Sequence, residues 1–449
     1  MGDQAKSLAE IGVDLTVTLV DARNHHTFQP LLYQVATAGL DAGDVCYPTR
    51  RIARTIPAVR SLQGRVVDIN FDAQSVVLDD STRLAYDSLI LAFGGVTADF
   101  GVDGVAEHGF GLKSAADADV LREHVLTQFD RAANAVARGE DVDLATTTIA
   151  VVGGGPTGVE MAGGYAELTS RVLLPDYPEI DPKDVRILLI EGHDALLAGF
   201  SPKLQANAAS TLANMGVEVH FNKQVSRVTA NSLEINDGTV VAASTVVWAA
   251  GIRAHPLAEA AGLDVGRGGR IVVDEQLRVP GHRNVYAIGD VAATTIDSSG
   301  TLAPQVAPVA VQGGEFVSGR IVASLAPSQG TEPSFVYENK GSMATIGRNA
   351  AVVELPNGKQ FSGFVGWVAW LGLHLVMLMG FRNRASVFVN WAWNYLTYDR
   401  GSRAVIDTTP PLAIVSRKDE VEQVGHEPLG QQVPQALDED KSGARDEIG

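Results

Sequence analysis

The stretch TIAVVGGGPTGVEMAG, residues 148–163, decides the fold class of this chain of 449 residues. An apolar run ends at Val152, and Gly153, Gly155 and Gly158 follow with Gly-x-Gly-x-x-Gly spacing. A strand, a tight turn and a helix in this order direct backbone N–H groups and the positive end of a helix dipole at a pyrophosphate. Glycine is needed because a Cβ would block that approach. Close packing of a helix on a strand is the alternative, but the flanking strand and helix favour dinucleotide binding.

The next strand should end at the acidic residue that holds the ribose of the dinucleotide. Residues 185–190 form this strand and Glu191 follows it, 33 residues after Gly158. The usual separation is ~20 residues, and the proline-rich segment at residues 173–184 accounts for the excess. A carboxylate accepts hydrogen bonds from a free 2′-hydroxyl and repels a 2′-phosphate, and residues 192–194 contain no Arg or Lys to offset it. We therefore expect NADH to be preferred over NADPH.

Other apolar runs also end at glycine or at an acidic residue, which is the pattern of an α/β protein with parallel sheets. We expect strands at residues 15–20, 88–92, 148–152, 185–190, 245–249 and 284–288. Gly289 and Asp290 follow the last of these, and the Asp290 carboxylate could accept hydrogen bonds from a ribityl chain. A strand-end turn or a helix N-cap is the alternative. Gly94 and Gly251 end two other runs and mark places where the chain passes between domains.

Charge and cysteine content exclude several classes of protein. The net charge of −18 argues against nucleic acid as a partner, because a polyanion would be repelled over much of the surface. Cys46 is the only cysteine, which excludes an internal disulfide and a thiolate zinc site and fits a reducing, cytosolic setting. His25 and His26 are adjacent, so their side chains point to opposite faces of an extended segment, and we expect no metal site.

The C-terminal part of the chain suggests contact with a membrane. Residues 361–381 contain no formal charge and are long enough to span a bilayer. The Trp and Tyr residues in and after this run, with arginines close by, are instead typical of helices that lie among lipid headgroups. We therefore expect an interfacial helix pair rather than a span, with a soluble dimer interface as a further alternative. Residues 416–449 contain nine Asp or Glu against four Lys or Arg and no aromatic residue, which predicts disorder.

Seven motifs together resemble one family. They are GGGPTGVEMAG, VDARNHHTFQPLLYQVA, YDSLILAFGG, VWAAGI, NVYAIGD, VQGG and KGSMATIGR, spread over about residues 5–405. The set is similar to the type II NADH:quinone oxidoreductases. The resemblance implies an α/β fold with two Rossmann-like dinucleotide-binding domains, for FAD and NADH, and a C-terminal membrane-anchoring helical region. The implied segments are an FAD domain at 1–112 and 264–330, an NADH domain at 113–263, an anchoring region at 331–405 and an acidic disordered tail at 406–449.

The resemblance also assigns roles to single residues. Asp21 would hold the adenosine ribose of FAD and Asp290 its ribityl chain, whereas Gly153, Gly155, Gly158 and Glu191 would bind NADH. Gly94, Gly251 and Gly289 are further cofactor-binding candidates. Glu160 matches a glutamate near the nicotinamide and flavin, although a first-turn carboxylate stabilised by the helix dipole is the alternative. Gln312 matches the second glutamine of the quinone-site pattern Ala-Gln-x-Ala-x-Gln, in which Pro308 replaces the first. Lys340 matches the lysine of KGSMATIGR, and a solvated lysine is the alternative.

The strand at residues 13–20, which ends at Asp21, has no glycine loop before it. In the family, the FAD phosphates would rest on a first strand and glycine loop at this place. We expect a start codon misplaced downstream of that strand, because the later motifs are intact apart from one glutamine. A chain that truly lacks the strand would leave two neighbouring strands without hydrogen-bond partners.

The implied reaction is hydride transfer from NADH to FAD, followed by reduction of a membrane quinone without proton pumping. The protein would be peripheral at the cytoplasmic face of the cell membrane, with the lipid bilayer surface as a partner and a homodimer left open. Three alternatives remain. They are a disulfide or sulfide reductase, which the single cysteine disfavours, an NADH oxidase with a soluble acceptor, and a catalytically impaired or flavin-free membrane-associated nucleotide-binding protein.

Overall fold

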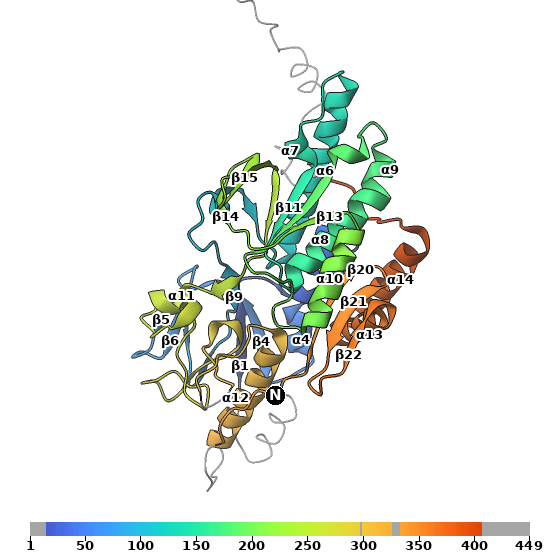
Figure 1. The fold of residues 1–449 in the computed structure, drawn as a ribbon. Coiled ribbons are helices and arrows are strands. Elements are labelled where there is room, and N and C mark those ends of the chain that lie inside the picture. Colours follow the sequence, from blue (N-terminus) through green and yellow to red (C-terminus); the bar gives the residue numbers. More distant parts are fainter. Residues whose placement is uncertain (1–14, 297–298, 326–332, 406–449) are drawn as a thin grey trace, which may run out of the picture. The chain divides into compact units, whose positions relative to one another are not determined.

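The glycine-rich turn follows the central strand of a five-stranded parallel sheet. The structure, a computed structural model, describes residues 15–296, 299–325 and 333–405 (Figure 1). The strands lie in the order β10 (Gly109–Phe110), β17 (Thr245–Trp248), β11 (Thr148–Val152), β12 (Arg186–Ile190) and β13 (Val217–His220). The expected strands at residues 148–152, 185–190 and 245–249 are confirmed to within one residue at each end.

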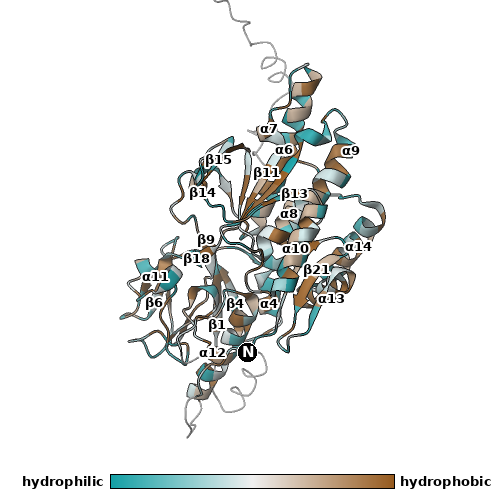
Figure 2. Ribbon diagram, viewed as in Figure 1, coloured by the Kyte–Doolittle hydropathy of each residue, from teal (hydrophilic) through white to brown (hydrophobic). Residues whose placement is uncertain are grey.

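Alternate residues of these strands enter two separate cores. Ile149 and Val151 pack against the helices α6 (Ala115–Ala137), α8 (Pro156–Leu168) and α10 (Pro202–Asn214). Ala150 and Val152 face the antiparallel sheet of β14 (Val225–Val228), β15 (Ser232–Ile235) and β16 (Val240–Ala242). Because successive side chains of a strand point to opposite faces, both sides of the sheet are covered and β11 is buried throughout. Figure 2 shows the apolar colouring on these central strands.

Two further pairs of parallel strands contain the strands predicted at residues 15–20, 88–92 and 284–288. In one, β1 (Val17–Asp21) pairs with β4 (Val59–Gln63), and in the other β8 (Leu89–Leu91) pairs with β19 (Val285–Ala287). Within the described residues, β1 pairs along one edge, whereas β19 also forms a bridge between Tyr286 and Arg278 on its other edge. Two crossover strands, β9 (Gly95–Thr97) and β18 (Ile252–Ala254), pair with each other where the chain passes between the sheets.

A three-stranded antiparallel sheet and two helices form the C-terminal region. The strands are β20 (Ser342–Gly347), β21 (Ala350–Glu354) and β22 (Gln360–Ser362), and the helices are α13 (Gly363–Met377) and α14 (Phe381–Thr397). The uncharged run at residues 361–381 is therefore divided between β22, α13 and a turn. In the described ranges, no helix is long and apolar enough to cross a membrane.

Residues up to Val405 group into one compact unit, and the expected acidic tail lies outside the described residues. The boundaries expected at residues 112, 263 and 330 fall inside this unit and stay predictions.

Candidate active site

The glycine turn after β11 leaves an open surface in front of α8. Gly153 has φ of 106°, and a Cβ there would lie 2.5 Å from the carbonyl oxygen of Ala249. A Cβ on Gly158 would lie 1.7 Å from the carbonyl oxygen of Gly153, so both positions need glycine for packing. Gly155 is the N-cap of α8, and nothing lies within 4 Å of the place its Cβ would take. This open space at a helix N-terminus fits a pyrophosphate.

The structure places Glu191 directly against the glycine turn. Its Oε2 accepts a 2.5 Å hydrogen bond from the backbone N–H of Gly154, and its Oε1 accepts a 2.8 Å hydrogen bond from that of His193. The His193 Nδ1 also lies 2.6 Å from Glu191 Oε1. Glu191 is 8% exposed, so its carboxylate is buried against the turn. The contact of His193 with Glu191 was not predicted from the sequence, because residues 192–194 were considered only for an Arg or Lys that could bind a 2′-phosphate.

A second corner with an acidic residue follows β19. Asp290 Oδ2 lies 3.6 Å from the Lys113 Nζ, and a Cβ on Gly95 would lie 3.5 Å from the Cβ of Asp290. Gly289 packs against Ala310 in the first turns of α12 (Ala307–Leu325). The ends of β8 and β19, one helix N-terminus and one lysine therefore converge on Asp290.

The remaining residues predicted to bind a cofactor lie at strand ends. Nothing stands within 4 Å of a Cβ on Gly94, which leaves a cradle beside the Asp290 corner. Gly251 precedes β18, and a Cβ there would lie 2.9 Å from the Phe100 ring. Asp21 ends β1, and its Oδ1 accepts a 2.8 Å hydrogen bond from the backbone N–H of Arg23. These residues fit a dinucleotide, and no hydrogen bond within the described residues joins Asp21 to the Asp290 corner.

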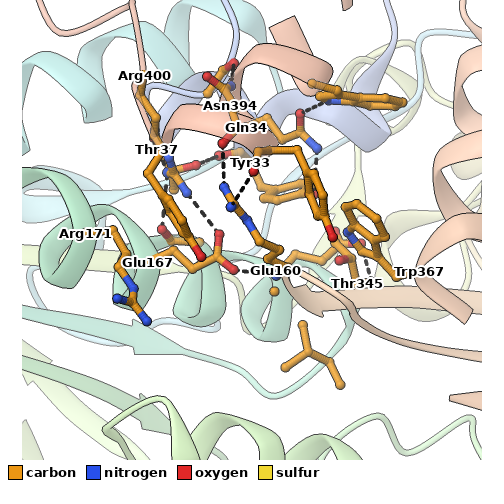
Figure 3. A pocket seen from close by; sticks show the side chains of 18 of the residues that line it. Tyr33, Gln34, Thr37, Glu160, Glu167, Arg171, Thr345, Trp367, Asn394 and Arg400 are labelled. Carbon is orange, nitrogen blue, oxygen red and sulfur yellow. Dashed lines mark hydrogen bonds and ion pairs between the residues drawn. The ribbon is translucent and has the colours of Figure 1, made fainter. Parts of the chain in front are cut away.

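Glu160 faces β20 and not the open surface of the glycine turn. Its Oε1 accepts a 3.4 Å hydrogen bond from the backbone N–H of Thr345 (Figure 3). Burial raises the pKa of Glu160 to about 8, against a smaller opposing effect of that hydrogen bond. A carboxyl group with such a pKa holds a proton at neutral pH and can exchange it there.

Glu160 lines a cavity of about 110 Å³ between α8, β20, the C-terminal helices and α2 (Leu32–Ala36). A chain of polar contacts crosses the cavity wall. The Trp391 Nε1–H donates to Gln34 Oε1 at 2.6 Å, and the Gln34 Nε2–H donates to the Tyr33 hydroxyl at 2.8 Å. Burial, with a smaller effect of Glu160, raises the pKa of Tyr33 well above its usual value. Tyr33 and Gln34 lie in FQPLLYQVA, which is part of one of the seven motifs. The sequence indicated this segment as a whole but did not predict a role for either residue.

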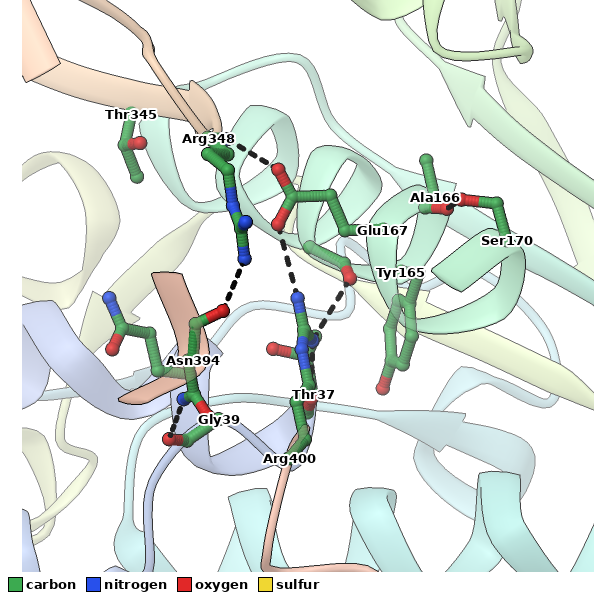
Figure 4. Close-up of polar contacts among 12 residues, drawn as sticks. Thr37, Gly39, Tyr165, Ala166, Glu167, Ser170, Thr345, Arg348, Asn394 and Arg400 are labelled. Atoms are coloured by element: carbon green, nitrogen blue, oxygen red, sulfur yellow. Dashed lines mark hydrogen bonds and ion pairs between the residues drawn. The ribbon is translucent and has the colours of Figure 1, made fainter. Parts of the chain in front are cut away.

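An ion network ties the end of α14 to α8 beside this cavity (Figure 4). The Arg400 side chain is 13% exposed, and it donates to Glu167 Oε2 at 3.1 Å and to the carbonyl oxygen of Thr37 at 2.5 Å. Arg348 donates to the carbonyl oxygens of Asn394 (2.6 Å) and Tyr395 (2.9 Å), which lie in the last turn of α14. None of these contacts was predicted from the sequence.

Gln312 and Lys340 meet at Glu338, outside the cavity that holds Glu160. The Gln312 amide donates to the carbonyl oxygen of Glu338 and accepts from its backbone N–H, both at 2.9 Å. Lys340 forms an ion pair with the Glu338 carboxylate. Neither Gln312 nor Lys340 lines the Glu160 cavity. Pro308 occupies the first turn of α12, where proline leaves the helix hydrogen bonds intact.

The described residues contain no group of three or more His, Cys, Asp or Glu side chains placed to hold a metal ion.

Comparison with known proteins matches two parts of the chain. Residues 3–314 match the family described as pyridine nucleotide-disulphide oxidoreductase, and residues 339–398 match the NDH2 C-terminal domain. The chain is 38% identical over 415 residues to the type II NADH:quinone oxidoreductase Ndh of Mycobacterium tuberculosis, which covers 90% of this chain and 87% of that protein. This chain belongs to the type II NADH:quinone oxidoreductase family.

Members of the family and more distant structures share the fold. The internal alternative NAD(P)H-ubiquinone oxidoreductase A1 of Arabidopsis thaliana mitochondria is 30% identical over 416 residues, with 86% of this chain and 81% of that protein covered. The structure of NDH2 from Plasmodium falciparum in complex with NADH has a TM-score of 0.78 at 22% identity and covers 87% of this chain and 94% of that one. The fold is therefore the α/β pyridine nucleotide-disulphide oxidoreductase fold, with two Rossmann-like domains and a C-terminal NDH2 domain.

A sulfide:quinone oxidoreductase from Aquifex aeolicus also matches this fold, with a TM-score of 0.65 at 15% identity over 87% of this chain and 92% of that one. The fold alone thus does not separate the two enzyme classes.

Proposed function

We propose that this protein oxidises NADH through bound FAD and passes the electrons to a quinone without pumping protons. The observation that carries the proposal is the position of Glu191, held against the glycine turn by the backbone N–H of Gly154. A second acidic residue at a strand end, Asp290, would mark the site of the other dinucleotide, FAD. When bound, FAD supplies the redox chemistry, and the protein supplies binding, orientation and protons.

Glu191 and the glycine turn would hold NADH. Gly153, Gly155 and Gly158 open the N-terminus of α8 to the pyrophosphate, and the Glu191 carboxylate accepts from the ribose hydroxyls. Two backbone N–H groups fix both carboxylate oxygens, so binding requires little rearrangement.

Residues at the second corner would hold FAD. Asp290, oriented by Lys113, accepts hydrogen bonds from the ribityl hydroxyls, and Gly94, Gly251 and Gly289 let the backbone approach the cofactor. Asp21 would hold the adenosine ribose at the end of β1.

Three further residues would serve the quinone. Gln312 and Lys340, joined through Glu338, offer an amide and an ammonium group to a quinone oxygen. Quinone reduction also consumes protons, and the Glu160 carboxyl, protonated at neutral pH, is the group placed to supply one.

The C-terminal helices would hold the enzyme at a membrane surface. Large apolar side chains stand exposed on both helices, namely Phe364, Val365, Val368, Val376, Met377, Phe381, Phe388, Val389, Trp393 and Leu396. We place this face in the headgroup region, at the cytoplasmic side where NADH is available, with the helices lying in the surface. A homodimer that covers the same face is the alternative, and it would show no binding to vesicles.

The segments proposed from the sequence serve these tasks: residues 1–112 and 264–330 for FAD, 113–263 for NADH and 331–405 for the membrane.

The first test is the visible spectrum of the protein purified in mild detergent. We expect stoichiometric flavin that is bleached by NADH under anaerobic conditions and recoloured by quinone. A colourless protein would refute the flavoenzyme. A flavin that NADH bleaches but only oxygen or a soluble acceptor reoxidises would instead support the NADH oxidase.

A further inference from the structure

An exposed cluster of arginines lies outside both nucleotide sites, in a chain whose net charge is −18. The helix α4 (Thr49–Arg54) carries Arg50, Arg51 and Arg54, all exposed. None of the three forms an ion pair with a described carboxylate. Arg50 and Arg54 are four residues apart and so share one side of the helix. Unpaired like charges this close repel one another, so the cluster is suited to an anionic partner.

The cluster adjoins the turn between the two C-terminal helices. Arg51 lies over the Tyr47 ring, with its Cζ 5.4 Å from the ring centre. The same ring packs against Gly380, where a Cβ would lie 2.4 Å from it. Phe381 follows Gly380 and is 86% exposed, and Arg382 next to it is exposed and has no ion pair within the described residues. An apolar tip thus lies next to Arg382 and, across the Tyr47 ring, near Arg51 of the cluster.

Hydrogen bonds fix this arrangement. The Asn383 amide donates to the carbonyl oxygens of Asp44 and Cys46, both at 2.9 Å, which clamps the first turn of α14 to the strand before α4. The nearby Asp44 carboxylate accepts from the Ser386 hydroxyl at 2.6 Å and from the Asn390 amide at 3.0 Å. Asp44, the acidic residue nearest to the cluster along the chain, therefore binds side chains of α14 and forms no ion pair with the arginines.

We propose that Arg50, Arg51, Arg54 and Arg382 bind the phosphate groups of anionic lipids, so that this enzyme docks preferentially on negatively charged membranes. The inference rests on the membrane contact of the proposed function. Phe381 enters the boundary between headgroups and acyl chains, and the arginines pair with phosphates around it. Each arginine adds attraction that salt weakens, whereas the apolar face of α13 and α14 binds any bilayer.

The test is flotation of the flavin-loaded protein with vesicles of phosphatidylcholine alone and with vesicles that contain equal parts of phosphatidylglycerol. We expect tighter binding to the mixed vesicles, lost on raising the salt from about 0.1 M to about 1 M. The variant R50Q/R51Q/R54Q should bind mixed vesicles about a hundredfold more weakly, roughly fivefold for each arginine. Its binding to neutral vesicles should not change. The control R83Q/R131Q/R283Q removes the same charge from exposed arginines on other elements and should bind as the parent does.

Each other outcome overturns the proposal in a recognisable way. Equal binding of the parent to both kinds of vesicle refutes the arginine surface and leaves the membrane contact standing. No binding to either kind refutes both. A triple variant that loses its flavin, or its NADH oxidation with a soluble quinone in detergent, would show that these arginines hold the cofactor's phosphates and not lipid.

Discussion

The backbone N–H of Gly154, in the middle of the glycine turn, donates a 2.5 Å hydrogen bond to the carboxylate of Glu191 at the end of the neighbouring strand. The turn that would bind a pyrophosphate and the acid that would bind a ribose are thus one rigid unit. The Gly154 N–H donates to one carboxylate oxygen of Glu191 and the His193 N–H to the other, so both oxygens are fixed in place.

Glu191→Gln should shift the enzyme toward NADPH. The amide oxygen can still accept from the Gly154 N–H, but it carries no charge to repel a 2′-phosphate. We expect the ratio of kcat/KM for NADPH to that for NADH to rise roughly tenfold or more, since a hydrogen bond to a charged group contributes about 1.5–3 kcal/mol. His193→Ala, which leaves the carboxylate in place, is the control and should keep the preference for NADH. An unchanged ratio in Glu191→Gln would mean that the ribose is held elsewhere.

Gly155→Ala should weaken NADH binding without lowering the stability of the fold. A Cβ at Gly155 meets no protein atom within 4 Å, whereas one at Gly158 would lie 1.7 Å from the carbonyl oxygen of Gly153. The first substitution should therefore leave the melting temperature nearly unchanged and raise the KM for NADH. Gly158→Ala should lower the stability as well. Thermal unfolding together with NADH titration checks both, and a normal KM in Gly155→Ala would argue against a pyrophosphate at this turn.

The sequence predicted the parts of the site that depend on local order along the chain. The glycine turn and Glu191 were found because spacing within one βαβ unit determines their geometry. Arg400 and Glu167 are 233 residues apart, and their contact depends on how α14 packs on α8, which no local pattern encodes. The division of residues 361–381 had a local signal, since Gly380 takes a positive φ of 85° in the turn before two arginines. Lys113 gave no such signal, because its partner Asp290 comes from another part of the fold.

Glu160→Gln should change how stability depends on pH. Burial raises the pKa of Glu160 to about 8 in the folded protein, from 4.5 for a free side chain. Between these values the folded state holds a proton that the unfolded state has released, so stability falls as pH rises from about 5 to about 8. The variant should lose this slope and be more stable at pH 8 by an amount on the order of a few kcal/mol. Urea unfolding across this pH range tests it, with the exposed Glu107→Gln as control; a slope that persists in Glu160→Gln would exclude Glu160 as its source.

Gln312→Ala should impair quinone reduction more than flavin reduction. The substitution removes both hydrogen bonds to the Glu338 backbone and so releases the segment that carries Lys340. Rapid mixing with NADH should bleach the flavin at the parental rate, whereas turnover with a quinone should fall roughly tenfold, as for the loss of about 1.4 kcal/mol. Gln63→Ala on the exposed side of β4 is the control. Equal loss in both steps would place Gln312 at the NADH side instead.

Arg400→Gln should destabilise the protein far more than the loss of a comparable surface ion pair. Arg400 and Glu167 are largely buried, with side chains 13% and 23% exposed, and the loss of Arg400 would leave the Glu167 carboxylate, 3.1 Å away, without that partner. Breaking a buried pair from one side costs about 3–5 kcal/mol, because the remaining charge is uncompensated. Arg403→Gln, which breaks the more exposed pair with Asp176, should cost less than about 1 kcal/mol. Urea unfolding of Arg400→Met, Glu167→Met and the double variant completes the cycle. If the network acts as one unit, the double variant should recover much of the stability lost in Arg400→Met; strictly additive losses would show that the two side chains stabilise α8 independently.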